Sequence, residues 1–294
     1  MPSTPGALSI IGAAPHLQLR MGSPVLSVSD DAVHRVLLED GRCESARWVM
    51  DGRPTATPAK PATASPVAAG LFQHFLGWEV RTAIDCFDDR QVELMDFQAT
   101  AAGLHFCYVL PYGPRSALVE TTWISTLALK PDHEAELRAY LLSRYGLCEF
   151  ERVYQETGCL PLPIQPPPKP APGIVRLGQA AGTLRPSTGF AFLETLADAQ
   201  RIASCLARAG PDTTTIPSFH RRRLDRWMDQ VFFEAMQADW SQAPRYFMAL
   251  FGGTRAPALV AFLSGQATLA QRWQVAMQLP KMDFLRAAWR CLSA

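Results

Sequence analysis

Alternating apolar and polar positions run through the middle third of the chain and predict a series of β-strands. In RSALVETTWIS (115–125), apolar side chains recur at every second position. The runs GWEVRTAI, QVELMDFQ and LHFCYVL, between residues 77 and 110, read as strands as well. The turn-forming sequences DCFDDR, ATAAG and PYGPR separate these runs. The pattern therefore predicts an antiparallel meander over residues 72–125.

Shorter strand-like runs precede this region. VLSVS, AVHRVLLE and ARWVMD predict strands within residues 25–51, and EDGR between the second and third is a hairpin turn signal. IVRLG (174–178) predicts one further short strand. Two proline-rich stretches, 54–70 and 160–173, are expected to be extended connections or linkers.

Helical patterns dominate the rest of the chain. One helix is predicted from Pro131, which suits a first turn, to Gly146, which suits a helix end. A longer helix is expected after residue 190, with Ser187 or Thr188 as its N-cap. Five more apolar-periodic runs follow between residues 221 and 293. The order of strands, meander and helices predicts a mixed α/β (α+β) fold.

Composition narrows the function classes. The 294 residues carry a formal net charge of +1, which gives no electrostatic support for nucleic-acid binding. The seven cysteines form no CxxC pair and the six histidines show no metal-ligand spacing, so we expect no metal site and a reducing, cytoplasmic setting. The N-terminus lacks a basic signal-peptide region, and the most apolar segment is interrupted by Arg255 and Pro257.

Two carboxylates within predicted strands are candidates for proton chemistry. Glu120 shares its strand face with Leu118 and Ile124, and Asp96 lies between Met95 and Phe97. A buried acid has a raised pKa and can donate or shuttle a proton. The alternative for each is a carboxylate on an edge strand that faces water or pairs with an arginine.

A loop rich in glycine, serine and threonine, RLGQAAGTLRPSTGF (176–190), joins a predicted strand to a predicted helix. Such a loop either brings backbone close to a ligand or is an ordinary connection. It is neither a P-loop nor GxGxxG, and the chain contains no GxSxG motif.

Charged and aromatic runs mark the C-terminal part of the chain. The run HRRRLDRW (220–227) is expected to form the solvated face of a helix, with contact to anionic headgroups as the alternative. Most of the aromatic and methionine side chains that follow are expected to be core. Some could instead line an apolar ligand tunnel or a lipid-facing surface.

Four segments, taken together, resemble the bacterial lycopene β-cyclase family in their order and spacing. They are FQHFLGWEV, ELMDFQ, FCYVLPYGPRSALVETTWIS and VRLGQAAGTLRPSTGFAF. The helical C-terminal region is also similar to that family. The resemblance runs from about Val25 to the end of the chain.

The resemblance implies a flavin-dependent but redox-neutral enzyme of carotenoid biosynthesis, an intramolecular lyase or isomerase. A linear ψ-end of lycopene is protonated, the cation closes a six-membered ring, and loss of a proton leaves the β-ring of β-carotene. FAD in its reduced form is the implied cofactor, and NAD(P)H keeps it reduced. The implied partners are lycopene or another linear carotenoid and the inner face of the cell membrane, on which the enzyme is peripheral.

The resemblance also assigns site residues. The residue after Glu120 is Thr121, where many members carry a second acid or an aromatic residue. Pro54 replaces a usual glycine in VMDGRP (49–54). The implied catalytic residues are Glu120, Asp96 and Glu79. The implied flavin-binding residues are Asp51, Gly52, Arg53, Gly178, Gly182, Pro186, Ser187, Thr188, Gly189 and Phe190.

The implied domain organisation is a truncated FAD-binding flavoprotein fold. Residues 1–54 and 173–210 form the remainder of the FAD-binding domain, 70–165 an antiparallel-sheet catalytic domain, and 211–294 a helical C-terminal region. Family members begin with a strand and GxGxxG, which hold the FAD pyrophosphate. The sequence lacks that motif, so we expect a misassigned start or a truncated gene.

Two other functions remain open for the sequence. The first is a related flavin-dependent hydroxylase or isoprenoid reductase, which would consume NAD(P)H as product forms. The second is a non-catalytic remnant that binds carotenoid or membrane but no flavin.

Overall fold

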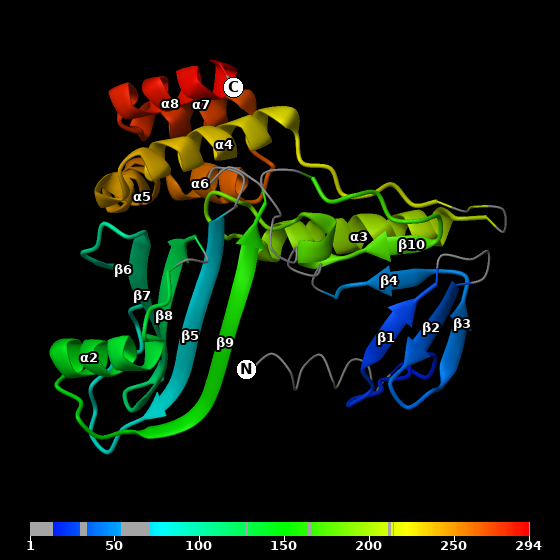
Figure 1. The fold of residues 1–294 in the computed structure, drawn as a ribbon, viewed down its shortest axis with the longest axis horizontal. Helices are drawn as coiled ribbons and strands as arrows, with labels where there is room; N and C mark the ends of the chain where they lie inside the picture. The colour runs from blue at the N-terminus through cyan, green and yellow to red at the C-terminus, as the bar shows by residue number, and fades with distance from the viewer. Residues whose placement is uncertain are drawn as a thin grey trace.

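Three β-sheets, one long helix and a C-terminal group of helices make up the part of the chain that the structure, a computed structural model, describes (Figure 1). The described residues are 14–29, 34–53, 71–126, 129–163, 166–210, 213 and 215–293. The predicted linker 54–70, with Pro54, lies outside them.

The N-terminal strands form a small antiparallel sheet. It contains β1 (Val25–Val28), β2 (His34–Leu38) and β3 (Cys43–Ala46), and the β2–β3 pairing confirms the predicted hairpin. The prediction of one strand over ARWVMD is wrong. β3 ends at Ala46, and β4 (Val49–Asp51) instead pairs in parallel with β10 (Ile174–Arg176), which is more than 120 residues further along the chain.

The central sheet has five antiparallel strands in the order β6-β7-β8-β5-β9. The meander is confirmed for β6, β7 and β8. It is wrong for β5, which pairs with β8 and β9 rather than with β6, so that β8 is an interior strand. The sequence analysis did not predict β9. The strands are β5 (Leu71–Arg81), β6 (Glu93–Gln98), β7 (Leu104–Gly113), β8 (Ser116–Ser125) and β9 (Glu151–Leu162).

Helix α2 (His133–Tyr145) covers one face of this sheet, and its apolar side packs on the buried side chains of β5, β7 and β8. Asp132 is its N-cap, because its carboxylate accepts a hydrogen bond from the Ala135 amide. Pro131 therefore lies just before the cap rather than in the first turn. Gly146 ends the helix in the left-handed conformation, as predicted.

Helices α4–α8 pack together beside one end of the sheet (Figure 1). Their aromatic side chains reach the sheet where Phe247 contacts Phe97 of β6. Within the described residues, no helix combines the length and apolar character needed to cross a membrane. The predicted mixed α/β fold with a helical C-terminal region is confirmed. The helices are α3 (Phe192–Arg208), α4 (Arg223–Ala238), α5 (Ala243–Gly253), α6 (Ala256–Leu263), α7 (Leu269–Gln278) and α8 (Lys281–Ser293), with short 3-10 turns η2 (Gly178–Ala181) and η3 (Trp240–Gln242).

Two local predictions in this region are wrong. Ser187 and Thr188 do not cap α3, which begins after Ala191 without a side-chain cap. The run 220–227 is not simply a solvated helix face: Arg221 is buried in an ion pair with Glu194. The run precedes and begins α4, and two ion pairs bury part of it: Arg221 with Glu194 of α3 and Asp225 with Arg272 of α7.

Candidate functional site

The two faces of the central sheet differ in what covers them. Side chains of β5 alternate, so that Leu76, Trp78 and Val80 pack toward α2 while the intervening residues point to the other side. We call that other side the Glu120 face. It carries Gln73, Phe75, Gly77, Glu79, Tyr108, Leu118, Glu120, Thr122 and Glu156.

Glu120 lies on interior strand β8, which rules out an edge strand for this residue. Its strand neighbours in the same row are Tyr108 of β7 and Gly77 of β5. Burial raises the pKa of the Glu120 carboxyl to about 7. The Thr122 hydroxyl donates a hydrogen bond to this carboxyl at 2.5 Å, which lowers the pKa and offsets part of the rise. At neutral pH the carboxyl group is therefore partly protonated and able to donate a proton.

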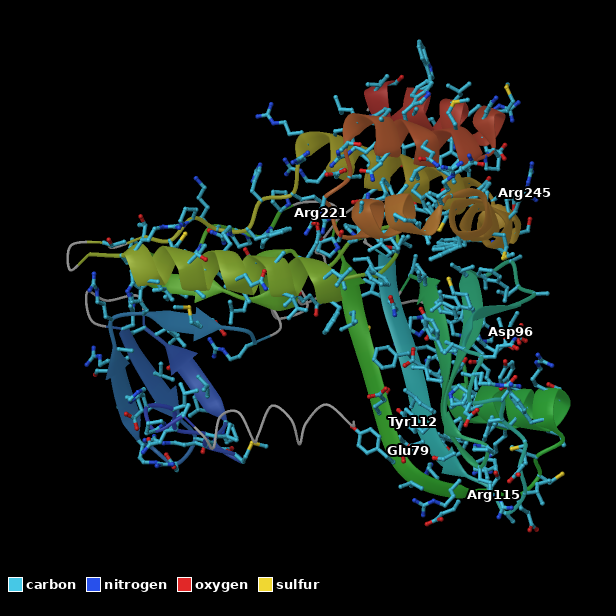
Figure 2. The ribbon with its side chains drawn as sticks, turned by 180° about the vertical axis from the view of Figure 1, so that it is seen from behind. Glu79, Asp96, Tyr112, Arg115, Arg221 and Arg245 are labelled. Carbon is cyan, nitrogen blue, oxygen red and sulfur yellow. The ribbon has the colours of Figure 1, made fainter. Side chains whose placement is uncertain are left out.

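Glu79 occupies the same face, one row away from Glu120. It is half-buried and aligns with Leu118 and Tyr154 on the neighbouring strands. Tyr112 lies nearby (Figure 2), where burial raises the pKa of its phenol and the charge of Glu79 adds to the shift. The structure thus brings together two of the three predicted catalytic acids.

Asp96 belongs to the opposite face. It aligns with Cys107 and Thr121, which lie on the α2 side, and its carboxylate accepts a hydrogen bond from the Tyr140 hydroxyl of α2 at 2.8 Å. Figure 2 labels it on the side of the sheet where α2 packs. The β6 strand has a register shift between Glu93 and Asp96, which a sequence pattern does not reveal. The sheet therefore separates Asp96 from Glu120.

The loop 178–190 reaches the Glu120 face at Gln73. Gly189 has a positive φ of 70°, which favours glycine, and a Cβ atom there would lie 2.2 Å from Gln73 Oε1, so the loop backbone approaches Gln73 closely. Gln73 lies four residues from Gly77 along β5, roughly 13 Å at the usual rise of a strand. The loop and the two acids therefore border one surface.

The parallel β4–β10 pairing unites the two predicted flavin-binding segments. The Leu177 amide donates to the Asp51 carbonyl at 2.9 Å, and a Cβ atom at Gly52 would lie 3.9 Å from Leu177 Cβ. The Arg53 guanidinium bonds the Asp51 carboxylate at 2.9 Å and holds the pKa of that carboxyl below its usual range. Residues 51–53 consequently lie beside the start of loop 178–190.

Residues 185–187 of this loop attach it to helix α4 and to the protein interior, and so do not face a ligand. The Ser187 hydroxyl donates to Asp229 of α4 at 2.5 Å, and Pro186 is buried. Arg185 is fully buried, pairs with Asp229 at 2.8 Å, and lies 3.8 Å from the centre of the Phe262 ring. Sequence reasoning missed Arg185 and Asp229, although an arginine inside a glycine-rich loop was a visible signal.

Thr188 and Phe190 sit at the outer side of the anchored segment. Thr188 Oγ1 is shielded from solvent and has no hydrogen-bond partner among the described residues, and Phe190 is exposed. Arg176 Nε, beside Asp51, is likewise buried without such a partner in the described part of the chain. Orphaned donors of this kind fit the oxygen and nitrogen atoms of a polar ring system such as a flavin.

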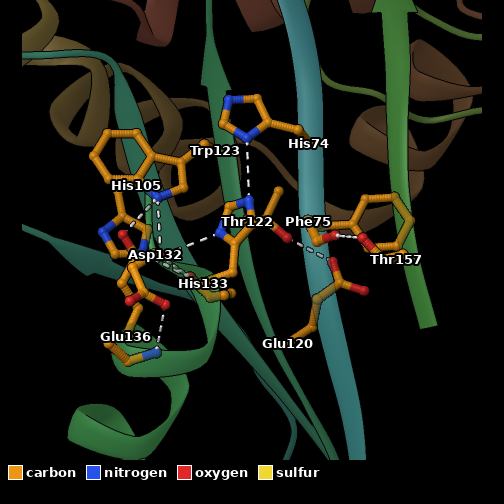
Figure 3. A network of polar contacts seen from close by, with 12 residues as sticks. His74, Phe75, His105, Glu120, Thr122, Trp123, Asp132, His133, Glu136 and Thr157 are labelled. Carbon is orange, nitrogen blue, oxygen red and sulfur yellow. Dashed lines mark hydrogen bonds and ion pairs between the residues drawn. The ribbon is translucent and has the colours of Figure 1, made fainter. Parts of the chain in front are cut away.

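A polar network that the sequence did not reveal lies on the α2 side of the sheet (Figure 3). Glu136 of α2 accepts hydrogen bonds from Trp123 (3.1 Å) and Thr121 (3.0 Å). His74 bonds Ser125 at 2.8 Å and His133 at 3.2 Å, and burial lowers its pKa to about 4. These groups are satisfied by one another beneath α2, which is consistent with a structural role.

Comparison with known proteins identifies relatives of nearly the whole chain. The family model described as lycopene cyclase protein matches residues 17–289. A lycopene beta-cyclase from Pseudescherichia vulneris is 28% identical over 279 residues, covering 90% of this chain and 68% of the relative.

Two solved structures are similar at a lower level. A geranylgeranyl bacteriochlorophyll reductase-like protein from Thermoplasma acidophilum gives a TM-score of 0.46 at 15% identity, covering 90% of this chain and 65% of that one. A flavin-dependent halogenase from Xanthomonas campestris gives 0.42 at 13% identity, covering 95% and 62%. The chain spans less than two thirds of either protein. On the family match over residues 17–289, the chain belongs to the lycopene cyclase family.

Proposed function

We propose that this protein cyclises a linear carotenoid, converting ψ-ends of lycopene to β-rings without net oxidation or reduction. One observation supports this above the others. In a chain of the lycopene cyclase family, Glu120 lies half-buried on an interior strand with its pKa raised to about 7. An acid with a pKa near the working pH is suited to general acid catalysis.

The residues of the Glu120 face suggest how the reaction proceeds. The Thr122 hydroxyl orients the carboxyl group of Glu120, which donates its proton to the terminal double bond of the ψ-end. The resulting carbocation needs electron-rich neighbours in a site with little water. Tyr108 and Phe75 lie on the Glu120 face as electron-rich rings, and buried Phe106 holds Tyr108 in an edge-to-face pair with ring centroids 5.1 Å apart.

We propose FAD in reduced form as the cofactor, with NAD(P)H as its reductant. Thr188, Gly189, Phe190 and residues 51–53 would hold the flavin. Gly189 meets the Glu120 face at Gln73, residues 51–53 lie beside the start of the loop, and Thr188 has a shielded hydroxyl without a partner among the described residues. When bound, a reduced flavin supplies negative charge beside the cation. Ser187 and Pro186 would not contact the flavin but would hold the loop in place, because the Ser187 hydroxyl is hydrogen-bonded to Asp229 and Pro186 is buried in the protein interior.

We also propose that the protein sits on an anionic membrane surface through helices α7 and α8. Exposed apolar side chains follow one stripe of each helix, and we call them together the α7–α8 apolar surface. Exposed Lys281, Arg286 and Arg290 flank the stripe on α8. An apolar stripe bordered by cations is typical of helices that lie in a membrane interface. The surface consists of Leu269, Trp273, Met277, Met282, Leu285, Trp289 and Leu292.

Beside this surface, α4, α6, α7 and α8 enclose an apolar groove of about 850 Å³. Phe232, Phe262 and Phe284 are among its lining residues. A groove of this size and character suits a carotenoid that leaves the lipid phase.

The test is expression of the chain in bacteria that accumulate lycopene, with the carotenoids separated by chromatography. We expect cyclised carotenoid with the unaltered chain and at least a ~100-fold loss with Glu120→Gln, since the amide cannot donate the proton. The matched control is Glu151→Gln, which changes an exposed acid at the start of β9. Cyclisation that persists in Glu120→Gln would show that another group is the acid.

The competing functions give different results in the same system. A hydroxylase or reductase would consume NAD(P)H in proportion to product, whereas a cyclase would not. A non-catalytic carotenoid-binding protein would retain lycopene unchanged and leave added FAD unbound in a fluorescence titration. Either result would overturn the proposal.

A further inference from the structure

Glu120 has a second carboxylate in its own row of the sheet. The row runs from Tyr108 of β7 through Glu120 and Gly77 to Glu156 of β9. Their Cα atoms, two strands apart, are about 10 Å from each other by ordinary strand spacing. Both glutamates are half-buried and project from the same face.

Gly77, which lies between the two acids in this row, has no side chain, and the side chains of Glu156 and Leu118 fill the space above it. A Cβ atom at this position would lie 3.1 Å from Glu156 Cγ and 3.4 Å from Glu156 Oε1, so the Glu156 carboxylate lies over the glycine. The backbone of Gly77 has no positive φ that would itself require glycine. The absence of a side chain therefore allows Glu156 to lean from β9 toward β8.

We infer that Glu156 is the second carboxylate of the proton-transfer site and shares one proton with Glu120 across Gly77. Two carboxyl groups in one site resist double ionisation, so the pair retains a proton at a pH where an isolated glutamate has lost it. This inference rests on the proposed function and deepens it.

The charged surroundings of Glu120 agree with this pairing. Burial is the main cause of the raised pKa of Glu120, the hydrogen bond from Thr122 lowers this pKa, and the negative charge of Glu156 adds a smaller rise. The other titratable groups on this face are Tyr108, Glu79, Tyr112, Tyr154 and the exposed ion pair of Arg81 with Glu151. Burial raises the pKa of Tyr108 and of Tyr112, so both phenols are neutral and the acids determine the local charge.

Under this proposal Glu156 positions the proton and the pair recovers it. Glu120 gives its proton to one carbon of the terminal double bond, and the π electrons of that bond form the new C–H bond. A second double bond then attacks the cation and closes the ring. Breaking of a C–H bond next to the ring cation forms the ring double bond, and that proton returns to the carboxylate pair. No oxidant or reductant is consumed.

The experiment measures the protonation of Glu120 directly, without substrate. The protein is labelled with ¹³C at glutamate side-chain carboxyl carbons, and the Glu120 resonance is assigned by its loss in Glu120→Gln. We expect a midpoint at about pH 7 in the unaltered chain. In Glu156→Gln the midpoint falls by roughly one unit, because a neighbouring negative charge is lost.

Gly77→Ala and Glu151→Gln complete the design. The added methyl group of Gly77→Ala displaces the Glu156 carboxylate and lowers the midpoint in the same direction. Glu151→Gln changes an exposed acid on the same strand and leaves it unaltered. An unchanged midpoint in both Glu156→Gln and Gly77→Ala, with native circular dichroism, would overturn the inference.

Enzymatic activity gives a separate readout. Because Glu120 must be protonated to act, the alkaline limb of the rate–pH profile shifts to lower pH in Glu156→Gln and stays in place in Glu151→Gln. If the chain cyclises no carotenoid at all, the proposed function fails while the NMR midpoints still decide whether the two acids share a proton.

Discussion

At the scale of single residues, the sequence predicted the strand face of Glu120 but not its surroundings. Period-two alternation places Glu120 with Leu118 and Thr122, and the structure confirms this. The same reasoning could not show that Asp96 lies on the opposite face, because the β6 register shift breaks the alternation. The sequence did not indicate Glu156, because its position in the same row as Glu120 depends on the pairing of strands that are distant in the sequence.

The raised pKa of Glu120 has a consequence for folding. An acid whose pKa rises from 4.5 in the unfolded chain to about 7 in the folded one destabilises the fold as pH rises from 4.5 to 7, and the loss is complete above 7. At pH 8 we expect the free energy of unfolding of Glu120→Gln to exceed that of the unaltered chain by about 1–3 kcal/mol.

Well below pH 4.5, at roughly pH 3, the difference disappears, because glutamic acid is then neutral in both the folded and the unfolded chain. Urea denaturation followed by circular dichroism at the two pH values measures it. An equal difference at both pH values would show that Glu120 has an ordinary pKa in the folded chain.

At the scale of secondary structure, the helices were the easier prediction. Residues in the C-terminal helices show the 3.6-residue period over whole turns, and Gly146 is a local stop signal. β9 was harder, since it is an edge strand whose first five residues are all exposed and whose pattern has no buried side. Its pairing with β5 is a long-range contact, which no local pattern encodes.

The Arg185–Asp229 pair links the glycine-rich loop to α4, and we expect its loss to lower the free energy of unfolding substantially. Asp229→Ala leaves the Arg185 guanidinium buried without its carboxylate, for which we expect a cost of about 3–5 kcal/mol in the free energy of unfolding.

Glu234→Ala is the matched control on the same helix. It breaks a more exposed pair with Arg290, at 3.7 Å, and should cost less than about 1 kcal/mol. Urea denaturation compares the two variants, and equal costs would contradict a buried anchor at Asp229.

At the scale of the whole molecule, exposed apolar side chains concentrate on the outer helices. Trp273 and Trp289 are 69% and 73% exposed on α7 and α8, which lie on the far side of α4 from the sheet in Figure 1. Monomeric proteins in water rarely expose such an apolar patch unless it binds a partner or a membrane.

Sedimentation with lipid vesicles tests this surface. We expect the protein to bind vesicles rich in anionic lipid, and the double variant Trp273→Ser, Trp289→Ser to bind at least ~10-fold more weakly, because each tryptophan contributes buried apolar area. Binding should also weaken with added salt, since cations flank the stripe. Ile84→Ser, which removes an exposed apolar side chain from the sheet region, should bind normally. Equal binding by the tryptophan variant would place the membrane contact elsewhere.

The pairing of β4 with β10 also bears on how the chain folds. More than 120 residues separate the two strands, and a flexible loop of that length makes closure slow. The five-stranded sheet lies within this interval, and Leu71 at its start is the register partner of Leu162 at its end. Once that sheet has folded, its entry and exit points are neighbours, and the effective loop becomes short. We therefore expect the surface shared by loop 178–190 and residues 51–53 to form after the five-stranded sheet.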